Sequence, residues 1–260
     1  MIRKALSLAV SIATVSLMVS LYLGSAAAEG REAVDRVVFV HYRIHPAGVG
    51  GGGPTVTDTI DTFSWAPKLH WPSDTPAITY RIDAVNSSGL SASAIRSAVS
   101  AGFGTWTLAD ANVTFTAGPA VALSADPFAA ADGINSVSWR SLGAGSSNII
   151  AVTGIWYGRG SKLVVEVDTI FNDDLSFSVT PYDPGDPDPT YSGPVDGNGS
   201  PTAFDVTDIA THEFGHWLVL GDLYRPSTRL LTMYGYSAEG ETYKDTLGTG
   251  DVLGIQTIYP

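Results

Sequence analysis

The pentapeptide His-Glu-Phe-Gly-His at residues 212–216 constrains this chain more than any other feature of its sequence. In an α-helix, residues four apart project from the same face, so His212 and His216 can present their imidazoles to one metal ion. This spacing suits a tetrahedral Zn²⁺, and Glu213 beside the first histidine can act as general base for a metal-activated water. The same pattern also arises by chance in amphipathic helices, so the rest of the chain decides between a zinc site and two incidental histidines.

A catalytic zinc site needs a third protein ligand and an open position. No histidine follows His216, so this ligand is either a distant N-terminal histidine or a carboxylate. Asp222 comes directly after Gly221, and a glycine there can end the helix in a left-handed turn that returns the chain to the metal. The rival carboxylates, Glu239 and Glu241, lie in a glycine- and tyrosine-rich segment that is not typical of a helix. We expect Asp222 to be the ligand, and a different arrangement stays open.

The N-terminus predicts export. Two basic residues precede an apolar run at residues 5–23, and residues 26–28 are all alanine. This is the order of a secretory signal peptide, which we place at residues 1–28, and a retained membrane anchor is the alternative. We therefore expect a secreted, extracellular protein with no stable membrane association after the signal is removed.

The composition excludes several partners and stabilising devices. A formal net charge of −12 speaks against binding to nucleic acid or to an anionic membrane surface. The chain has no cysteine, so packing or bound ions must stabilise it in place of disulfides. Ca²⁺ is a candidate second ion, because Asp168, Asp173, Asp174 and the acidic loop 183–198 offer hard oxygen ligands. Solvated turns are the alternative explanation for these carboxylates.

The chain divides near residue 62. Residues 29–62 hold one strand candidate at 34–44 and a glycine-rich break at 48–54, which we interpret as an N-terminal extension, either a short propeptide or an added strand. Residues 63–260 have the pattern of an α+β domain. Its expected strands lie at 78–82, 113–115, 136–139, 149–156 and 163–171, and its expected helices at 91–106, from about 205 to about 221, and 250–258. A long proline- and aspartate-rich loop covers 172–200.

Four segments, in chain order, resemble the metzincin zinc peptidases and the matrixins in particular. Residues 212–222 (HEFGHWLVLGD) are similar to the metzincin zinc signature His-Glu-x-x-His-x-x-Gly-x-x-His/Asp. The segment at Leu231-Thr-Met233 resembles the methionine turn of that clan. Residues 78–106 resemble the opening strand and helix of matrixins, and residues 250–259 resemble their last helix.

The resemblance implies a fold and a site. The fold is a metzincin-like catalytic domain with a twisted, mostly parallel sheet, an antiparallel edge strand, an active-site helix and a C-terminal helix. Zinc would be held by His212, His216 and Asp222, the last as in the snapalysin-like branch. Met233 would form an apolar floor under the metal, and Tyr234 and Tyr236 are candidates for the substrate pocket, or else plain core aromatics. Residues 149–156 resemble the edge strand on which an extended peptide substrate pairs.

Two departures from the family pattern carry further expectations. Val219 stands where the signature has glycine, and a β-branched residue resists positive φ. We therefore expect the helix to continue to Leu220 and Gly221 to make the turn. Because there is no cysteine for a thiol switch, any inhibition by residues 29–62 would use Asp58, Asp61, a histidine or simple steric cover.

Together these features predict a secreted, monomeric zinc endopeptidase that hydrolyses protein or peptide substrates, with Glu213 as general base. One alternative is a catalytically silent binding protein with a metzincin fold, against which the retained Glu213 speaks. Another is a zinc hydrolase of a non-peptide substrate. A purely structural zinc site would usually have four ligands, often cysteines, and this chain has none.

Overall fold

A computed structural model describes residues 32–44, 61–66, 68–119, 123, 126–180 and 199–260. The predicted signal peptide, most of the segment that joins the N-terminal extension to the domain, and the acidic loop 183–198 lie outside the described residues. Within the described ranges, no helix is both long enough and apolar enough to cross a membrane.

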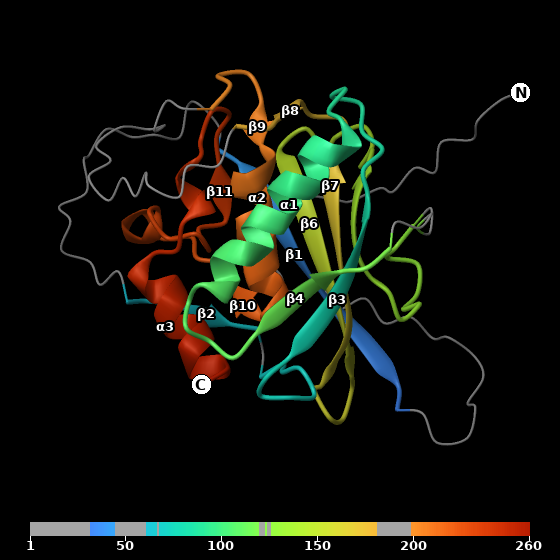
Figure 1. Cartoon of the computed structure of the whole chain (residues 1–260), viewed down its shortest axis with the longest axis vertical. Coiled ribbons are helices and arrows are strands. Elements are labelled where there is room, and N and C mark those ends of the chain that lie inside the picture. Colours follow the sequence, from blue (N-terminus) through green and yellow to red (C-terminus); the bar gives the residue numbers. More distant parts are fainter. Residues whose placement is uncertain (1–31, 45–60, 67, 120–122, 124–125, 181–198) are drawn as a thin grey trace, which may run out of the picture.

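A seven-stranded mixed sheet forms the centre of the chain, in the order β11-β1-β6-β7-β5-β3-β4 (Figure 1). Its strands are β1 (Val34–Arg43), β3 (Ala77–Asp83), β4 (Thr114–Ala117), β5 (Asn135–Arg140), β6 (Ile149–Gly158), β7 (Val164–Asn172) and β11 (Tyr236–Ser237). The β1–β6 and β6–β7 pairs are antiparallel, and the other four pairs are parallel. This confirms the expected mixed α and β chain with a mostly parallel sheet.

Two small two-stranded sheets lie beside the main one. One pairs β2 (Ser64–Trp65) with β10 (Leu220–Gly221), and the other pairs β8 (Phe177–Ser178) with β9 (Phe204–Asp205). Short 3-10 turns, η1 (Pro226–Thr228) and η2 (Tyr243–Asp245), interrupt the C-terminal segment. The second of these small sheets delivers the chain directly into the helix that carries the pentapeptide.

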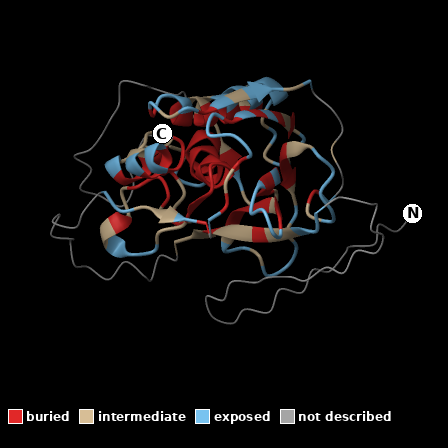
Figure 2. Cartoon of the chain, turned by 90° about the horizontal axis from the view of Figure 1, so that it is seen from below, coloured by how far each residue is buried: buried red, intermediate tan, exposed pale blue. Residues whose placement is uncertain are grey.

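The described residues also form three α-helices: α1 (Ala92–Thr107), α2 (Val206–Trp217) and α3 (Thr249–Ile258). The first two begin at side-chain caps, because Ser91 accepts from the Ala94 N–H and Asp205 accepts from the N–H groups of two first-turn residues of α2. These helices pack together on one face of the sheet (Figure 1), where Phe103 stacks on Phe214 with ring centroids 3.5 Å apart. Figure 2 shows the buried residues gathered between these layers.

The strand at residues 149–156 is not an edge strand in this chain, so that part of the prediction is wrong. β1 pairs with β6 from Val34↔Gly158 to Tyr42↔Ile149 and covers the free edge. The sequence of β1, VDRVVFVHYR, is rich in β-branched and aromatic residues, which favour an extended strand. The N-terminal extension therefore contributes a strand to the main sheet and is not a separate appendage.

Candidate metal centre and catalytic base

Helix α2 presents His212 and His216 on one side, and the chain after it brings Asp222 back to them. The Oδ1 atom of Asp222 lies 3.2 Å from Nε2 of His212 and 3.5 Å from Nε2 of His216. Both imidazoles are fully buried, and the carboxylate side chain is only 6% exposed. The structure thus brings together the three residues expected as ligands, each offering one atom within 4.8 Å of the others.

The hydrogen bonds of the two Nδ1 atoms determine that the Nε2 atoms of His212 and His216 face Asp222. Nδ1 of His212 lies 2.7 Å from the carbonyl oxygen of Thr232, and Nδ1 of His216 lies 2.9 Å from that of Leu220. A carbonyl only accepts, so each Nδ1 is the N–H donor, and when the ring is neutral its Nε2 turns a lone pair inward. These hydrogen bonds are the usual support for histidines that bind a metal.

Three acceptor atoms therefore meet in a buried space: the two Nε2 atoms and Oδ1 of Asp222. None of the three has a hydrogen-bond partner in the structure. Buried acceptors that face one another repel unless a cation or a proton lies between them. Two imidazole nitrogens and one carboxylate oxygen are a donor set that Zn²⁺ accepts at a catalytic site, so the residues present fit this metal.

The charges of the cluster follow from burial and from the carboxylate. Burial lowers the pKa of His212 to about 4, and the neighbouring Asp222 offsets this only in part. Burial also opposes a charged His216, but Asp222 and Glu213 outweigh it and raise the pKa of that imidazole. The pKa of Asp222 is held well below its usual range, because the two imidazoles outweigh the effect of burial. Asp222 is therefore an anion, ready to coordinate a cation.

The turn that delivers Asp222 differs from the expected one. Helix α2 ends at Trp217, and Val219 takes the left-handed conformation with φ of 62°, so the prediction that Gly221 makes this turn is wrong. Gly221 instead lies in β10, paired with Ser64. A non-glycine residue in this conformation costs about 1–2 kcal/mol. Full burial of Val219 and the hydrogen bond from the Ala66 N–H to its carbonyl (2.8 Å) offset that cost.

The carboxylate of Glu213 is held on one side and free on the other. Its Oε2 accepts from Oγ1 of Thr153 on β6 at 2.5 Å. Thr153 lies 2.7 Å from Thr169 on β7, which accepts from the indole N–H of Trp217 at 2.9 Å. The network is consistent with each group donating toward the carboxylate: Trp217 to Thr169, Thr169 to Thr153, and Thr153 to Glu213. Burial raises the pKa of Glu213 to about 7.

Met233 packs against helix α2 at Gly215. A Cβ on Gly215 would collide with the sulfur of Met233, so the helix can sit on this side chain only because residue 215 is glycine. Asp251 at the start of α3 accepts from the backbone N–H groups of Thr232 (2.8 Å) and Met233 (3.1 Å). Since the carbonyl of Thr232 in turn accepts from His212, α3 supports this candidate ligand through the segment 231–233.

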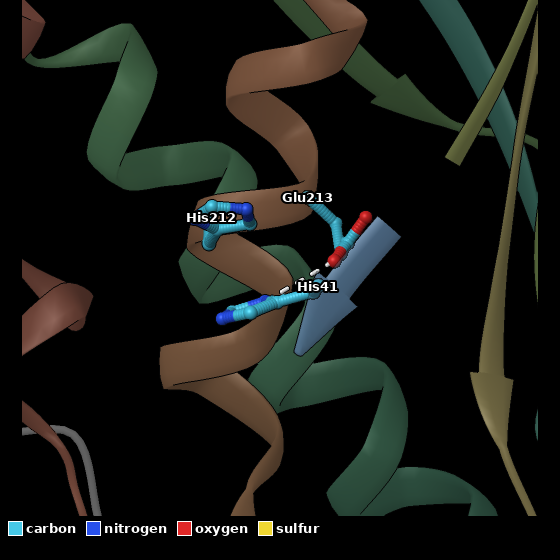
Figure 3. A group of neighbouring side chains, drawn as sticks. All are labelled: His41, His212 and Glu213. Atoms are coloured by element: carbon cyan, nitrogen blue, oxygen red, sulfur yellow. Dashed lines mark ion pairs between the residues drawn. The ribbon is translucent and has the colours of Figure 1, made fainter. Parts of the chain in front are cut away.

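Strand β1 lies directly over the cluster (Figure 3). The ring of Phe39 stacks on His216 with centroids 4.2 Å apart, and the ring of His41 lies 3.9 Å from that of His212. The Nδ1 atom of His41 is 3.3 Å from Oε1 of Glu213. Sequence reasoning considered an N-terminal histidine as a third metal ligand or as an inhibitory group of residues 29–62, and it missed Phe39 altogether.

His41 also joins a polar network beside the site. Its Nε2 lies 2.9 Å from Oγ of Ser237, which donates to Glu241. With the serine hydrogen directed at Glu241, Nε2 of His41 is the donor and Nδ1 turns its lone pair toward Glu213. The carboxylate of Glu241 is bound by the ammonium of Lys244 and by the N–H of Ala238, so it does not face the metal centre. The rival ligand Glu239 forms an ion pair with Arg43.

The tyrosines after the methionine turn form a wall with two others. Tyr236 belongs to β11, and its ring lies 5.5 Å from those of Tyr224 and Tyr234 and 6.2 Å from that of Tyr42. Tyr224, which sequence reasoning did not single out, interacts with Asp222, and burial together with this carboxylate raises its pKa. Gly235 leaves room for this contact, because a Cβ there would lie 2.5 Å from the Tyr224 ring.

The three aspartates proposed for calcium have separate partners. Asp168 is buried in β7, where Ser136 donates to it, while Asp173 accepts from the N–H of Ser87 at 2.7 Å and Asp174 accepts from Ser141 at 2.9 Å. Among the described residues, these aspartates do not converge as a ligand set. The loop 183–198 lies outside the described residues.

Comparison with known proteins adds no assignment. No protein-family model matches this chain, and a search of curated proteins found no match. The function must therefore be argued from the site itself.

Proposed function

We propose that this chain is a zinc-dependent endopeptidase of the metzincin type. The observation that carries the proposal is the meeting of three unpartnered buried acceptor atoms, from His212, His216 and Asp222, next to a glutamate with a free oxygen. A structural site would close this space with a fourth protein ligand, and none of the described residues supplies a cysteine for it.

The arrangement of elements supports the metzincin assignment. Within the seven-stranded sheet, the run β4-β3-β5-β7-β6 is parallel except for β6, which supports the mostly parallel sheet that the resemblance implies, although β1 follows β6 on that side and β6 is not the last strand. Helix α2 then carries the histidines, and Met233 lies beneath them against Gly215. These features occur in the expected chain order, which a chance His-Glu-x-x-His helix would not require.

The chemistry follows from the positions of the side chains. A bound Zn²⁺ would supply a Lewis acid that acidifies water and polarises a carbonyl. Glu213, with one oxygen held by Thr153 and the other free, would take a proton at that free oxygen and return it to the leaving amine. The buried, largely apolar surroundings strengthen these electrostatic interactions.

An extended polypeptide is the substrate that the surroundings favour. The edge of β6 next to Glu213 accepts a strand along its length, as the pairing with β1 demonstrates. Main-chain pairing of this kind gives affinity for extended peptides of many sequences. We therefore favour a peptidase over a zinc hydrolase of small non-peptide substrates. The proposal also includes secretion, which the N-terminal signal sequence supports, and a monomeric state, which the acidic net charge favours.

The test combines metal analysis with a peptide-cleavage assay on the chain from Glu29 onward. Because β1 covers the site, the assay is run on the intact chain and on chain cut within the glycine-rich segment 48–53. The proposal predicts bound zinc and chelator-sensitive cleavage that Glu213→Ala abolishes without loss of the metal. Absence of zinc from the purified chain, and no uptake of zinc on titration, would overturn it.

A further inference from the structure

Three hydrogen bonds in series join the last residue of α2 to the candidate base through the main sheet. The indole Nε1–H of Trp217 donates to Oγ1 of Thr169 on β7 at 2.9 Å. That oxygen lies 2.7 Å from Oγ1 of Thr153 on β6, and the two threonines are paired directly across the strands. Thr153 donates to Oε2 of Glu213 at 2.5 Å. These four side chains are called the indole-to-carboxylate network below.

The two ends of this network fix the direction of every hydrogen bond in it. An indole N–H only donates, an ionised carboxylate only accepts, and each threonine hydroxyl has a single hydrogen to give. Because the hydrogen of Thr153 goes to Glu213, the Thr153 oxygen accepts from Thr169. Thr169 in turn accepts from Trp217. A proton taken up at Oε1 of Glu213 leaves this direction unchanged, since Oε2 still accepts.

The network is held in the most deeply buried part of the molecule. None of its four side chains has exposed surface. The indole of Trp217 meets the rings of Phe103 and Phe214 edge-on, with centroids 5.0 Å and 5.6 Å away. The carbonyl of Trp217 accepts from the indole N–H of Trp71 at 2.7 Å. Removal of one member therefore leaves its neighbour with an unsatisfied buried group.

The network determines which oxygen of Glu213 is available. Figure 3 shows the two carboxylate oxygens pointing in different directions, one of them toward His41. The oxygen near His41 is Oε1, which has no hydrogen-bond partner among the described residues. Since Thr153 binds Oε2, it fixes the plane of the carboxylate and with it the direction of Oε1.

We propose that Thr169 and Trp217 are positioning residues for Glu213, acting through Thr153. They keep the Thr153 hydroxyl turned toward Oε2, so that Oε1 is the oxygen that takes up the proton. Two strands and the end of α2 thus set the geometry of the base from three parts of the fold. This role rests on the proposed function, whereas coupling along the network can be measured without hydrolysis and without metal.

Coupling is measured by NMR on the ¹⁵N-labelled chain from Glu29 onward. The chain has six tryptophans, and the indole signal of Trp217 is the one that Trp217→Phe removes. Hydrogen bonds in series polarise one another, so we expect Thr153→Val to move the Trp217 indole proton upfield, although Thr169 lies between the two side chains. Thr153→Ser should restore its position. A Trp217 signal that is the same in wild type and in Thr153→Val would overturn the proposal.

The positioning role is measured by cleavage of a quenched peptide with chain cut within residues 48–53. Thr169→Val removes the hydroxyl between Trp217 and Thr153. We expect kcat to fall by about 3- to 10-fold with KM unchanged, the effect of losing one neutral hydrogen bond away from the substrate. Thr169→Ser should recover most of the rate. Unchanged kcat in the valine variant, or no recovery with serine, would contradict the role.

A pair of tryptophan variants separates the hydrogen bond from the loss of buried volume. Trp217→Phe removes the donor at the start of the network. Trp139→Phe is the matched control, because Trp139 is also buried but its N–H has no partner among the described residues. We expect kcat to fall by about 3- to 10-fold in the first variant only, with zinc affinity kept in both. Equal losses in the two variants would mean that Trp217 acts by packing alone.

The two measurements distinguish this inference from the proposed function. If the Trp217 signal responds to Thr153→Val but the chain binds no zinc and cleaves no peptide, the network stands and the peptidase assignment falls. If cleavage depends on zinc and Glu213 while Thr169→Val and Trp217→Phe keep the wild-type kcat, the peptidase stands and the positioning role is refuted.

Discussion

Nδ1 of His41 lies 3.3 Å from Oε1 of Glu213, although 172 positions of sequence separate the two residues and both are fully buried. Neither atom has a hydrogen-bond partner elsewhere in the structure. The contact links the N-terminal extension to the expected catalytic base, and it places the imidazole of His41 beside the carboxylate oxygen of Glu213 that Thr153 does not bind. Burial above all, with His212, Lys244 and His216 nearby, holds the pKa of His41 well below its ordinary value, so the ring carries no charge here.

Replacing Asp222 by alanine should remove the metal. Asp222 is the only anionic side chain of the three expected ligands. Its loss therefore removes both a ligand and the negative charge that would balance the charge of the metal ion. Loss of a residue that only supports a metal ligand can lower metal affinity by up to about 100-fold. We therefore expect loss of Asp222, a ligand itself, to lower zinc affinity by at least about 100-fold. Zinc titration with a competing chelator measures this. Asp74→Ala, at an exposed carboxylate, is the control, and equal affinity in both variants would rule Asp222 out as a ligand.

Replacing Thr153 by valine should slow the reaction without releasing zinc. Valine keeps the shape but removes the hydroxyl that donates to Oε2 of Glu213. A hydrogen bond to a charged group is worth about 1.5–3 kcal/mol, which corresponds to about a 10- to 100-fold fall in kcat/KM. Thr153→Ser restores the donor and should recover most of the rate. If serine fails to rescue, or if valine has wild-type activity, Thr153 does not position the base.

Two glycine-to-alanine changes in helices should have opposite effects. A methyl group on Gly215 would collide with Met233, so we expect Gly215→Ala to lower the free energy of unfolding by about 1–3 kcal/mol and to weaken zinc binding. Gly104 in α1 has nothing within 4 Å of its Cβ position, so alanine there should raise the free energy of unfolding by about 0.5–1 kcal/mol. Urea unfolding measures both. Equal effects would contradict the packing of Met233 against the helix.

Asp168 should make stability depend on pH. Burial, partly offset by Ser136 and increased by Glu166, raises its pKa to about 8 from an ordinary value of 3.8. Between these values the folded chain keeps a proton that the unfolded chain has lost. The stability that this proton provides is therefore complete below about pH 4 and is lost as pH rises through about 8.

Asparagine at position 168 cannot ionise, so this contribution disappears in the Asp168→Asn variant. The free energy of unfolding should fall less steeply for the variant than for the wild type from about pH 5 to about pH 8. Urea titrations of both proteins across this range give the comparison. Parallel pH profiles would show that the buried carboxyl does not retain its proton.

Much of the fold could be predicted because its signals are local. Alternating and helical apolar patterns place β3, β5, β6, β7 and the helices α1 and α3 close to where they occur. The ligand Asp222 could be expected because no histidine follows His216 and the chain must turn shortly after α2. Both inferences need only residues near one another in the sequence.

The features that escaped prediction depend on distant partners. The sequence of β1 does not show which strand it pairs with, so neither its pairing with β6 nor the contact between His41 and Glu213 could be predicted. Val219 adopts a positive φ because its burial overrides the local steric preference, so the rule that favoured Gly221 failed there. Thr153 and Asp251 support the site across the fold, and their residue types alone carry no signal for that role.

The central claim is that His212, His216 and Asp222 hold a zinc ion on which peptide cleavage by Glu213 depends. The most direct measurement titrates Zn²⁺ into metal-free chain that has been cut within residues 48–53 and freed of β1, and follows hydrolysis of a quenched peptide. We predict activity that rises to a plateau at a single zinc ion per chain and is lost on chelation. In Glu213→Ala, zinc should bind equally well while kcat/KM falls by about 10²–10⁴-fold. Hydrolysis that is independent of zinc, or equal in the Glu213→Ala variant, would contradict the account.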